Sequence, residues 1–454
     1  MSKKIWIIAA AVIVIAAALP LIGNMSVKKI TDKRIDMLED NGVKVERKDN
    51  GSNYLTTREH FQFTLKDPVA FHAYLSTLSK EQVPAYLSTM LDDVVMAADV
   101  EYSNLILSSD VTLDLYPVAF TEAADTRMRA EDIKLYEQMM EMLDERVFMY
   151  HMEYDVSGEK FHGYIKDIDR EVVFGDGKRA KIIFESAVFK GKGTLVEPKS
   201  VDLNVKNADL DFALSDGSKM TLSMHELQSQ NRFSSKNSFD LNYKAEKLHF
   251  FYKDTVAELT IDAAGLSTVS DSQVHDGKLD TKLHTTMERF KLVDTNGSVR
   301  LDGFGFVMDA KNIDEEAYEA FQKASEQAGS ASQYTMLAAV GVISKGMELK
   351  IKELSVDQLA VNDSEMMKGF DHRIDILIKA DDKLVQKLQV SPLALLQNID
   401  IDAKLKFSDA FYRYLKKQNP QLSLADSFAK SEGGETHFDI VMKEGELSVN
   451  GQKL

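Results

Sequence analysis

The residues best suited to chemistry are His151, Glu153 and Asp155. In a β-strand, every second side chain lies on the same face, so an imidazole and two carboxylates would point the same way. Such a set could in principle ligate a metal ion. The alternate positions from Phe148 to Val156 are apolar, however, and a half-buried strand turns its polar positions toward water. We therefore interpret the three residues as a solvated strand face and predict no metal site.

Other polar pairs and a glycine-rich tripeptide have the same ambiguity. His225-Glu226, and His437 with Asp439, occupy polar positions among alternating apolar ones, which is typical of solvated strand faces. Gly191-Lys192-Gly193 resembles part of a glycine-rich nucleotide loop, but no third glycine follows at the required spacing. We interpret it as a turn between strands.

Motifs with a recognised mechanism are absent from the sequence. There is no Gly-x-Ser-x-Gly elbow, phosphate-binding loop, His-Glu-x-x-His or calcium loop. The chain has no cysteine, which excludes thiolate catalysis, cysteine-ligated metals and disulfides. We predict no catalytic or cofactor-binding residue and no cofactor, and expect a protein that is not an enzyme. A hydrolase whose active-site residues are dispersed in the sequence is the alternative.

Composition limits the possible partners. The chain has 454 residues, of which 44% are hydrophobic and 28% charged, and such values are ordinary for folded globular proteins. Its formal net charge is −17, and lysines and arginines are interleaved with acidic residues instead of forming a basic patch. A negative surface repels polyanions, so nucleic acid is not an expected partner.

The N-terminus carries a membrane signal. Lys3 and Lys4 precede an uncharged apolar run over residues 5–23, which as a helix is long enough to cross a hydrocarbon core of roughly 30 Å. A cleaved signal peptide is the alternative, because Ala16-Ala17-Ala18 fits a cleavage site. The apolar run continues past these alanines to Ile22, which favours an uncleaved signal-anchor over residues 1–24.

The orientation of this predicted anchor follows from two opposing arguments. Lys28, Lys29, Lys33 and Arg34 follow the run, and counting positive charges strictly would leave the body in the cytoplasm. A very short basic head before an apolar run is typical of a signal-anchor, and this favours export of the body.

The rest of the chain predicts an α+β fold, predominantly antiparallel β: an extended, hairpin-built sheet with interspersed helices. We divide it into an N-terminal α/β region (25–146), an antiparallel β region (147–310) and a C-terminal helix-plus-strand region (311–454). From about residue 147, apolar residues alternate with polar ones, and hairpin dipeptides punctuate the pattern. These dipeptides are Asp176-Gly177, Asp216-Gly217, Asp276-Gly277 and Asn296-Gly297. Helices are predicted near 69–78, 84–91, 133–143, 314–328, 334–343 and 411–415, and the strongly apolar helix at 334–343 is expected to be buried. An alternating strand is predicted at Ile399, Ile401, Ala403, Leu405 and Phe407, and a turn at Glu444-Gly445.

The alternating strands would give the sheet one apolar face. Such a face must be covered, and it could line a groove for acyl chains or another apolar ligand. The simpler interpretation is that the helices near 69–91 and 314–343 cover it, since sheets ordinarily bury their apolar face in protein. The residues that would form a ligand-binding face are Leu210, Phe212, Leu214, Leu222, Phe250, Phe304 and Phe306.

Several segments together resemble a bacterial family, the YdgA-like inner-membrane-anchored proteins of unknown function. The likeness rests on the Lys3-Lys4 head and apolar run, on Lys28-Lys29-Ile30, on residues 313–321 (IDEEAYEAF) and on residues 445–453 (GELSVNGQK). These motifs are structural, so no active-site residue is implied. The resemblance implies a single-pass protein of the bacterial inner membrane with its body in the periplasm.

The sequence as a whole predicts a membrane-anchored envelope protein that acts as a non-enzymatic structural or binding component. Its expected partners are the membrane, through the N-terminal helix, and lipid or envelope proteins. A carrier of lipid along an amphipathic sheet is the alternative within the binding class.

Overall fold

The computed structural model describes residues 35–49, 51, 56–79, 91–103, 110–155, 157–194, 198–213, 217–235, 237–328, 332–362 and 364–454. The predicted anchor and the predicted helix near 84–91 fall almost wholly outside these residues. No helix within the described ranges is both long and apolar enough to cross a membrane. The described chain divides into two compact units. Unit 1 extends to Gln230 and includes Phe251–Val256, and unit 2 comprises Asn231–Phe250 and Ala257–Leu454.

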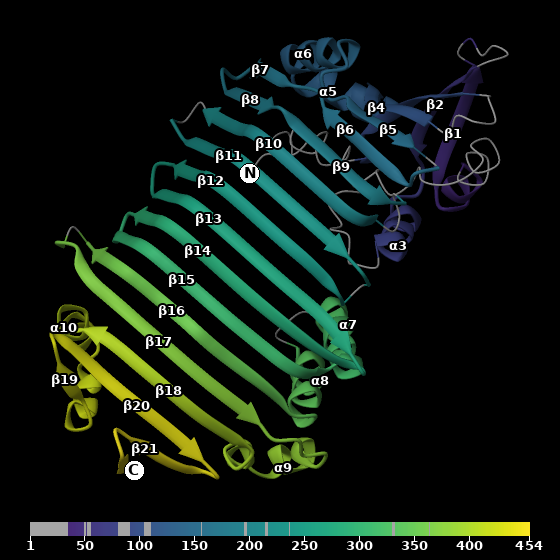
Figure 1. Ribbon diagram of the computed structural model, residues 1–454. Helices are drawn as coiled ribbons and strands as arrows, with labels where there is room; N and C mark the ends of the chain where they lie inside the picture. Colours follow the sequence, from purple (N-terminus) through teal and green to yellow (C-terminus); the bar gives the residue numbers. More distant parts are fainter. Residues whose placement is uncertain are drawn as a thin grey trace. The chain divides into compact units, whose positions relative to one another are not determined.

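Unit 1 is an antiparallel sheet built from successive hairpins (Figure 1). Its first five strands pair in chain order, and β6 follows them. In chain order, the elements are β1 (Val43–Asp49), β2 (Thr56–Leu65), α3 (Pro68–Ser79), β3 (Val94–Ser103), β4 (Asp110–Phe120), α5 (Glu122–Glu131), α6 (Ile133–Asp144), β5 (Tyr150–Asp155), β6 (Lys160–Ile165), β7 (Ile168–Val173), β8 (Arg179–Glu185), β9 (Ala187–Gly193), β10 (Pro198–Ala213) and β11 (Lys219–Phe233), whose last residues belong to unit 2.

Two strand pairs of unit 1 behave as single long strands with a break. β6 pairs with β9 and β7 with β8, and both ladders keep the same register. β8 and β9 also pair with β10 in one register, on either side of Ser186, which has a φ of 52°. Ser186 therefore interrupts the strand locally, and the register with β10 is the same on both sides of it.

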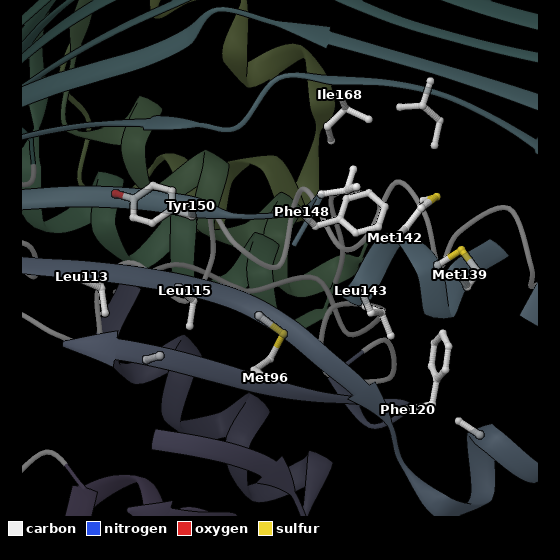
Figure 2. Packing of buried hydrophobic residues seen from close by; sticks show 14 of the residues in the cluster. Met96, Leu113, Leu115, Phe120, Met139, Met142, Leu143, Phe148, Tyr150 and Ile168 are labelled. Atoms are coloured by element: carbon white, nitrogen blue, oxygen red, sulfur yellow. The ribbon is translucent and has the colours of Figure 1, made fainter. Parts of the chain in front are cut away.

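Helices α5 and α6 cover the apolar face of the unit 1 sheet. Met139, Met142 and Leu143 of α6 point toward Phe120 and Phe148 (Figure 2), and all five are buried. α6 begins at an N-cap, where the Asp132 carboxylate accepts a hydrogen bond from the Leu135 N–H. The core also holds strand residues that alternate along β2 to β5: Phe61, Met96, Ala98, Leu113, Leu115, Tyr150 and Met152.

The strands of unit 2 are also antiparallel and joined by hairpins, and they are longer. β13 and β15 each have 18 residues, far above the usual strand length. Its elements are β12 (Phe239–Lys253, ending in unit 1), β13 (Glu258–His275), β14 (Lys278–Asp294), β15 (Gly297–Asp314), α7 (Glu315–Ala328), α8 (Gln333–Ser344), β16 (Met347–Val361), β17 (Met367–Ile378), α9 (Leu384–Val390), the 3₁₀ helix η2 (Pro392–Leu395), β18 (Ile399–Ser408), α10 (Asp409–Gln418), the 3₁₀ helix η3 (Pro420–Ser427), β19 (Lys430–Glu432), β20 (Glu435–Lys443), β21 (Glu446–Val449) and β22 (Gln452–Lys453).

The pairing of unit 2 follows chain order from β13 to β18. β18 then pairs with β20, whose other edge receives β19 and β21. The predicted predominance of antiparallel strands with interspersed helices is therefore confirmed. The structure provides no N-terminal helix to complete the predicted fold class, because that segment lies outside the described residues.

The hairpin turns show which dipeptide predictions were accurate. Asp276 and Gly277, both at positive φ, connect the paired residues His275 and Lys278, as a mirror-image two-residue turn requires. The turn predicted at Asn296-Gly297 is displaced by one residue, because Gly297 is already paired with Asp294. The Asp294 carboxylate accepts the N–H groups of Asn296 and Gly297, and this stabilises a turn centred on 295–296.

A kink crosses the middle of the unit 2 sheet. In β16, Val356 and Leu359 are both buried although strict alternation would place them on opposite faces, and Asp357 and Gln358 between them are both exposed. On the neighbouring strand β15, Gly303 has a φ of 68°, and a Cβ at this position would collide with the Asp357 side chain. The kink thus shifts the alternation so that apolar residues on both sides of it share one face.

Two sequence predictions need correction. Gly191 lies inside β9, opposite Phe161 of β6, whose ring occupies the space a Cβ would need, so the tripeptide is the end of a strand and not a turn. The helix predicted at 334–343 exists as α8, but it is not buried as expected. Its Tyr334, Met336 and Leu337 side chains are exposed.

Candidate functional site

The three polar residues that opened the sequence analysis do not converge on one point. His151 Nδ1 lies 2.6 Å from Asp114 Oδ1, and His151 Nε2 lies 3.5 Å from Glu153 Oε1. Asp155 instead accepts hydrogen bonds from Ser157 Oγ and the Gly158 N–H at the following turn. No group of three metal-ligating side chains with metal-site geometry occurs among the described residues.

His151 belongs to a polar ladder that the sequence did not reveal. Its members His60, Asp99, Asp114 and His151 lie on four neighbouring strands, with Asp99 paired opposite Asp114. His60 Nδ1 lies 2.7 Å from Asp99 Oδ1, which repeats the contact between His151 and Asp114. The ladder faces away from the buried core side of these strands.

Tyr116 and Arg146 complete the environment of Asp99. The Tyr116 hydroxyl donates to Asp99 Oδ2 at 2.6 Å, and an Arg146 guanidinium nitrogen lies 3.0 Å from the same oxygen. Burial acts to raise the pKa of Asp99, but the hydrogen bonds from Tyr116 and His60 and the charge of Arg146 outweigh it and hold that pKa below its usual range. Burial, with the hydrogen bond to Asp99, raises the pKa of Tyr116 far above its usual value.

The ladder is a network of hydrogen-bonded side chains. Asp99 is ion-paired with Arg146, Asp114 contacts His151, His60 Nε2 lies 3.3 Å from Gln62, and His151 Nε2 lies 3.5 Å from Glu153. A general base needs a nitrogen within hydrogen-bond reach of a substrate proton. The partners of these two rings occupy both nitrogens of each, so the arrangement supports a structural network.

The other predicted polar pairs also lie apart from one another. His225 Nδ1 lies 3.0 Å from Asn207 and its Nε2 lies 3.4 Å from Asp209, both on the adjacent strand β10. His437 Nε2 is 3.7 Å from Glu435 on its own strand, and the Asp439 backbone N–H donates to Asn450. These contacts agree with the interpretation of solvated strand faces.

The structure separates the seven residues of the predicted ligand-binding face. Phe212 is buried in the core of unit 1, and Leu210 packs against that core. Leu222 is exposed, and Leu214 lies outside the described residues. Phe250, Phe304 and Phe306 belong to unit 2, where all three are half-buried.

Around Phe304 and Phe306, the register of unit 2 aligns apolar side chains in rows across the strands. We call the face that carries these rows the unit 2 apolar face. The rows are Phe290–Leu301–Leu359–Met367, Met287–Phe304–Val356–Phe370–Phe407, Thr285–Phe306–Leu354–His372–Leu405–Phe438 and Leu283–Met308–Ile351–Ile374–Ala403–Ile440.

Among the described residues, helices cover the ends of the unit 2 apolar face. Val342 of α8 packs with Leu279, Ala310 and Ile313 at one end, together with apolar residues of α7. At the other end, Phe411 of α10 stacks on Phe370 with 5.6 Å between ring centroids. Within the described part of the chain, the apolar clusters that include these helices do not reach Phe304 or Phe306.

The predicted cover of the apolar face was therefore only partly accurate. The helix predicted near residue 69 exists as α3, but it packs with Leu38, Val43 and Leu65 in a small cluster of unit 1. α7 and α8 pack as expected on the sheet, at one end only. Unit 1 differs in this respect. Its inward-facing strand residues Leu113, Tyr150 and Met152 are fully buried.

His372 is the one titratable side chain in the rows above. Its ring stacks on Phe370 at 4.8 Å between centroids and contacts Phe407 edge-on. His372 Nδ1 accepts a hydrogen bond from the Lys406 backbone N–H at 3.3 Å. Burial lowers the pKa of His372, so the ring is neutral at pH 7 and adds no charge to this face.

Comparisons with known proteins returned nothing similar to this chain: no family model, no curated protein and no solved structure matches it.

Proposed function

We propose that this protein binds the acyl chains of lipids along the unit 2 apolar face. The observation that carries the proposal is the contrast between the two units. Both have the same alternating pattern, but α5 and α6 bury that face in unit 1, whereas Phe304, Phe306 and Met308 of unit 2 are only half-buried. A contiguous apolar surface that its own chain covers only in part is a candidate binding site.

The dimensions of the face suit an acyl chain. Strands rise about 3.3 Å per residue, so the even-numbered positions from Phe304 to Met308, which lie outside the cluster under α8, extend over roughly 13 Å. Each methylene of a lipid transferred from water to such a surface contributes about 0.8 kcal/mol. An acyl chain along one strand would therefore bind with useful affinity without any specific polar contact.

The opposite face of the same strands is wet and charged. Lys282, His284 and Glu288 of β14 are exposed. Arg300 of β15 makes two hydrogen bonds with Asp302. One side of the sheet thus faces water while the other offers hydrocarbon, as a shield for lipid requires.

The location of the protein is part of the proposal. The apolar run at residues 5–23 and the resemblance to the YdgA-like family support a single-pass signal-anchor in the bacterial inner membrane, with the body in the periplasm. A tethered sheet would have membrane lipid within reach. The proposal narrows the predicted structural or binding component of the envelope to lipid binding, with no enzymatic step.

Photo-crosslinking tests the proposal in cells. Phe306 and Met308 would each be replaced by p-benzoylphenylalanine, with the exposed His284 and Lys291 on the opposite face as controls. After irradiation, mass spectrometry should find lipid adducts at 306 and 308 and none at 284 and 291. No lipid adduct at 306 and 308, or equal adducts on both faces, would refute lipid binding by this face.

A further inference from the structure

His372 lies in the middle of the unit 2 apolar face. The register places it in one row with Phe306, directly between Leu354 of β16 and Leu405 of β18. Neighbouring strands are about 4.8 Å apart, so this row extends over roughly 24 Å from β14 to β20, compared with about 13 Å along one strand outside the cluster under α8. A longer acyl chain must therefore cross strands, and a chain that follows this row passes over the imidazole ring.

One hydrogen bond of the His372 ring requires the neutral form. Nδ1 accepts the backbone N–H of Lys406 at 3.3 Å. A protonated imidazole carries a hydrogen on both nitrogens and can accept nothing. Protonation would therefore set two donors against each other at Nδ1 and break this bond. It would also place a charge on a ring that is packed against Phe370 and Phe407.

The charged residues of β17 and β18 beside His372 lie on the opposite face of the sheet. Asp371 and Arg373 flank it on β17, so their side chains point to the wet side, where they are 3.9 Å apart. Lys404 and Lys406 flank its partner on β18 in the same way. Burial lowers the pKa of His372 by more than the carbonyl and the charge of Asp371 raise it.

The charged and titratable residues of β16 and α10 around His372 have other contacts. These contacts join Lys352 to Asp309, Glu353 to Ser355, Asp409 to Thr436, Tyr412 and Lys416 to Asp426, Arg413 to the Asp409 carbonyl, and the Tyr414 ring to Phe411. Lys417 is exposed. Among the described residues of these elements, no carboxylate forms an ion pair with His372, so a proton on this ring would have no counter-ion there.

We propose that His372 makes lipid binding by the unit 2 apolar face depend on pH, so that mild acid releases the bound acyl chain. This inference rests on the proposed lipid binding and adds its regulation. A neutral ring lets hydrocarbon cover the row without a gap. A charged ring must keep its hydration, and an acyl chain that covers it would remove that water at a large cost.

The direction of the pH effect follows from this competition. Bound lipid and the His372 proton disfavour each other, so binding is complete at pH values where the ring is neutral and weakens as the pH falls. Because the pKa of His372 in the fold is already below the ordinary 6.5, the release begins below that pH. The affinity should fall by about tenfold for each pH unit below the pKa of the lipid-free protein.

Photo-crosslinking at a series of pH values tests the proposal. Full-length protein with p-benzoylphenylalanine in place of Phe306 would be titrated in detergent with phosphatidylcholine, whose headgroup keeps its charge between pH 7.5 and pH 5. The readout is the lipid concentration that gives half of the maximal adduct. His372→Phe keeps an aromatic ring without a titrating nitrogen. His284→Gln is the matched control, because His284 is exposed on the opposite face of the same sheet.

The half-saturating concentration should rise at least about threefold from pH 7.5 to pH 5 in the parent and in His284→Gln, and it should stay constant in His372→Phe. Circular dichroism recorded at each pH identifies the range in which the protein stays folded, and only that range is compared. A constant value in the parent, or an equal rise in His372→Phe, would show that the pH coupling is wrong while lipid binding stands. Absence of adduct at pH 7.5 would instead refute lipid binding itself.

The proton on His372 provides an independent readout. In protein with isotope-labelled histidine, the NMR signal of this ring is identified by its loss in His372→Phe, and its pKa is measured by titration. Added phosphatidylcholine should lower that pKa, since coupling between two bound species is reciprocal. If a saturating amount of phosphatidylcholine leaves the pKa of His372 unchanged, the proposal is overturned.

Discussion

The guanidinium of Arg146 lies 3.9 Å from the centroid of the Tyr116 ring. Arg146 holds this position from a left-handed backbone conformation, with a φ of 51°. It occupies the residue after the C-cap of α6, where the Arg146 and Val147 N–H groups donate to the Leu143 and Met142 carbonyls. Glycine is the usual residue there, because a Cβ costs about 1 kcal/mol or more in this conformation.

At residue 146, backbone strain therefore lowers the stability of the fold, and the contacts of the Arg146 side chain raise it. Arg146→Ala should destabilise unit 1, since it removes the partner of Asp99 and keeps the strain. Arg146→Gly removes the same contacts but relieves the strain, so it should be more stable than the alanine variant by about 1 kcal/mol. Urea unfolding followed by circular dichroism measures this difference. A glycine variant no more stable than the alanine variant would show that strain is not stored at this residue.

Gly303 is predicted to be intolerant of a side chain. Its φ of 68° and the adjacent Asp357 side chain leave no room for a Cβ, so Gly303→Ala should lower the free energy of unfolding by about 1–3 kcal/mol. Gly341 in α8 is the matched control, since a Cβ there meets nothing within 4 Å. Gly341→Ala should be neutral or stabilising by up to about 1 kcal/mol. Equal effects of the two substitutions would contradict the role given to the kink.

His372 should make the stability of unit 2 depend on pH. Because burial lowers its pKa in the fold, the unfolded chain binds this proton more readily, and stability must decrease as the pH falls below the ordinary value of 6.5. His372→Phe should flatten that decrease between pH 7.5 and pH 5. An unchanged profile in His372→Phe would exclude this residue as the source.

Glu435 should stabilise unit 2 at neutral pH but not in strong acid. Hydrogen bonds from Lys368 and Lys406 hold the pKa of Glu435 at about 2. A lowered carboxylate pKa gives stability that is complete above the unfolded value of 4.5 and is lost as the pH falls toward 2. Glu435→Gln should therefore be less stable than the parent at pH 7 and equal to it near pH 2, as judged by denaturant midpoints. A constant difference across this range would contradict the ion-pair account.

The strands and hairpins could be predicted because their signal is local. Alternation at Ile399, Ile401 and Leu405 and the two-residue turn at Glu444-Gly445 depend on neighbours in the sequence, and the structure shows both features as expected. The kink at Gly303 could not be predicted in the same way. Its cause is the fit of a glycine beside an acidic side chain on another strand, which sequence periodicity does not contain.

The polar ladder was missed for a related reason. His60, Asp99, Asp114 and His151 follow one another at intervals of 39, 15 and 37 residues, and only the register of three strand pairs brings them together. Each one by itself is an ordinary polar position of a half-wet strand. The ladder could be found only by asking which residues of all four strands share a face and lie opposite one another. Answering that question requires the register of the strand pairs.

The sequence predicted that the strands have an apolar face, but it did not predict which part of that face helices cover. The alternation identified Phe304 and Phe306, whereas Phe212 at a similar position proved to be core. The difference lies in which helices pack over which strands, and this depends on tertiary contacts between α6 and the unit 1 sheet. Sequence alternation marks an oily strand face without showing what lies on it.

Native mass spectrometry of the purified full-length chain tests lipid binding most directly. The parent should retain lipid after detergent is removed, and Phe304→Asp with Phe306→Asp should lose it, because a charge in the middle of the face cannot contact hydrocarbon without a large desolvation cost. His284→Asp with Lys291→Asp, on the wet side of the same strands, should retain as much lipid as the parent. Equal lipid occupancy in all three proteins, or none in the parent, would contradict the account.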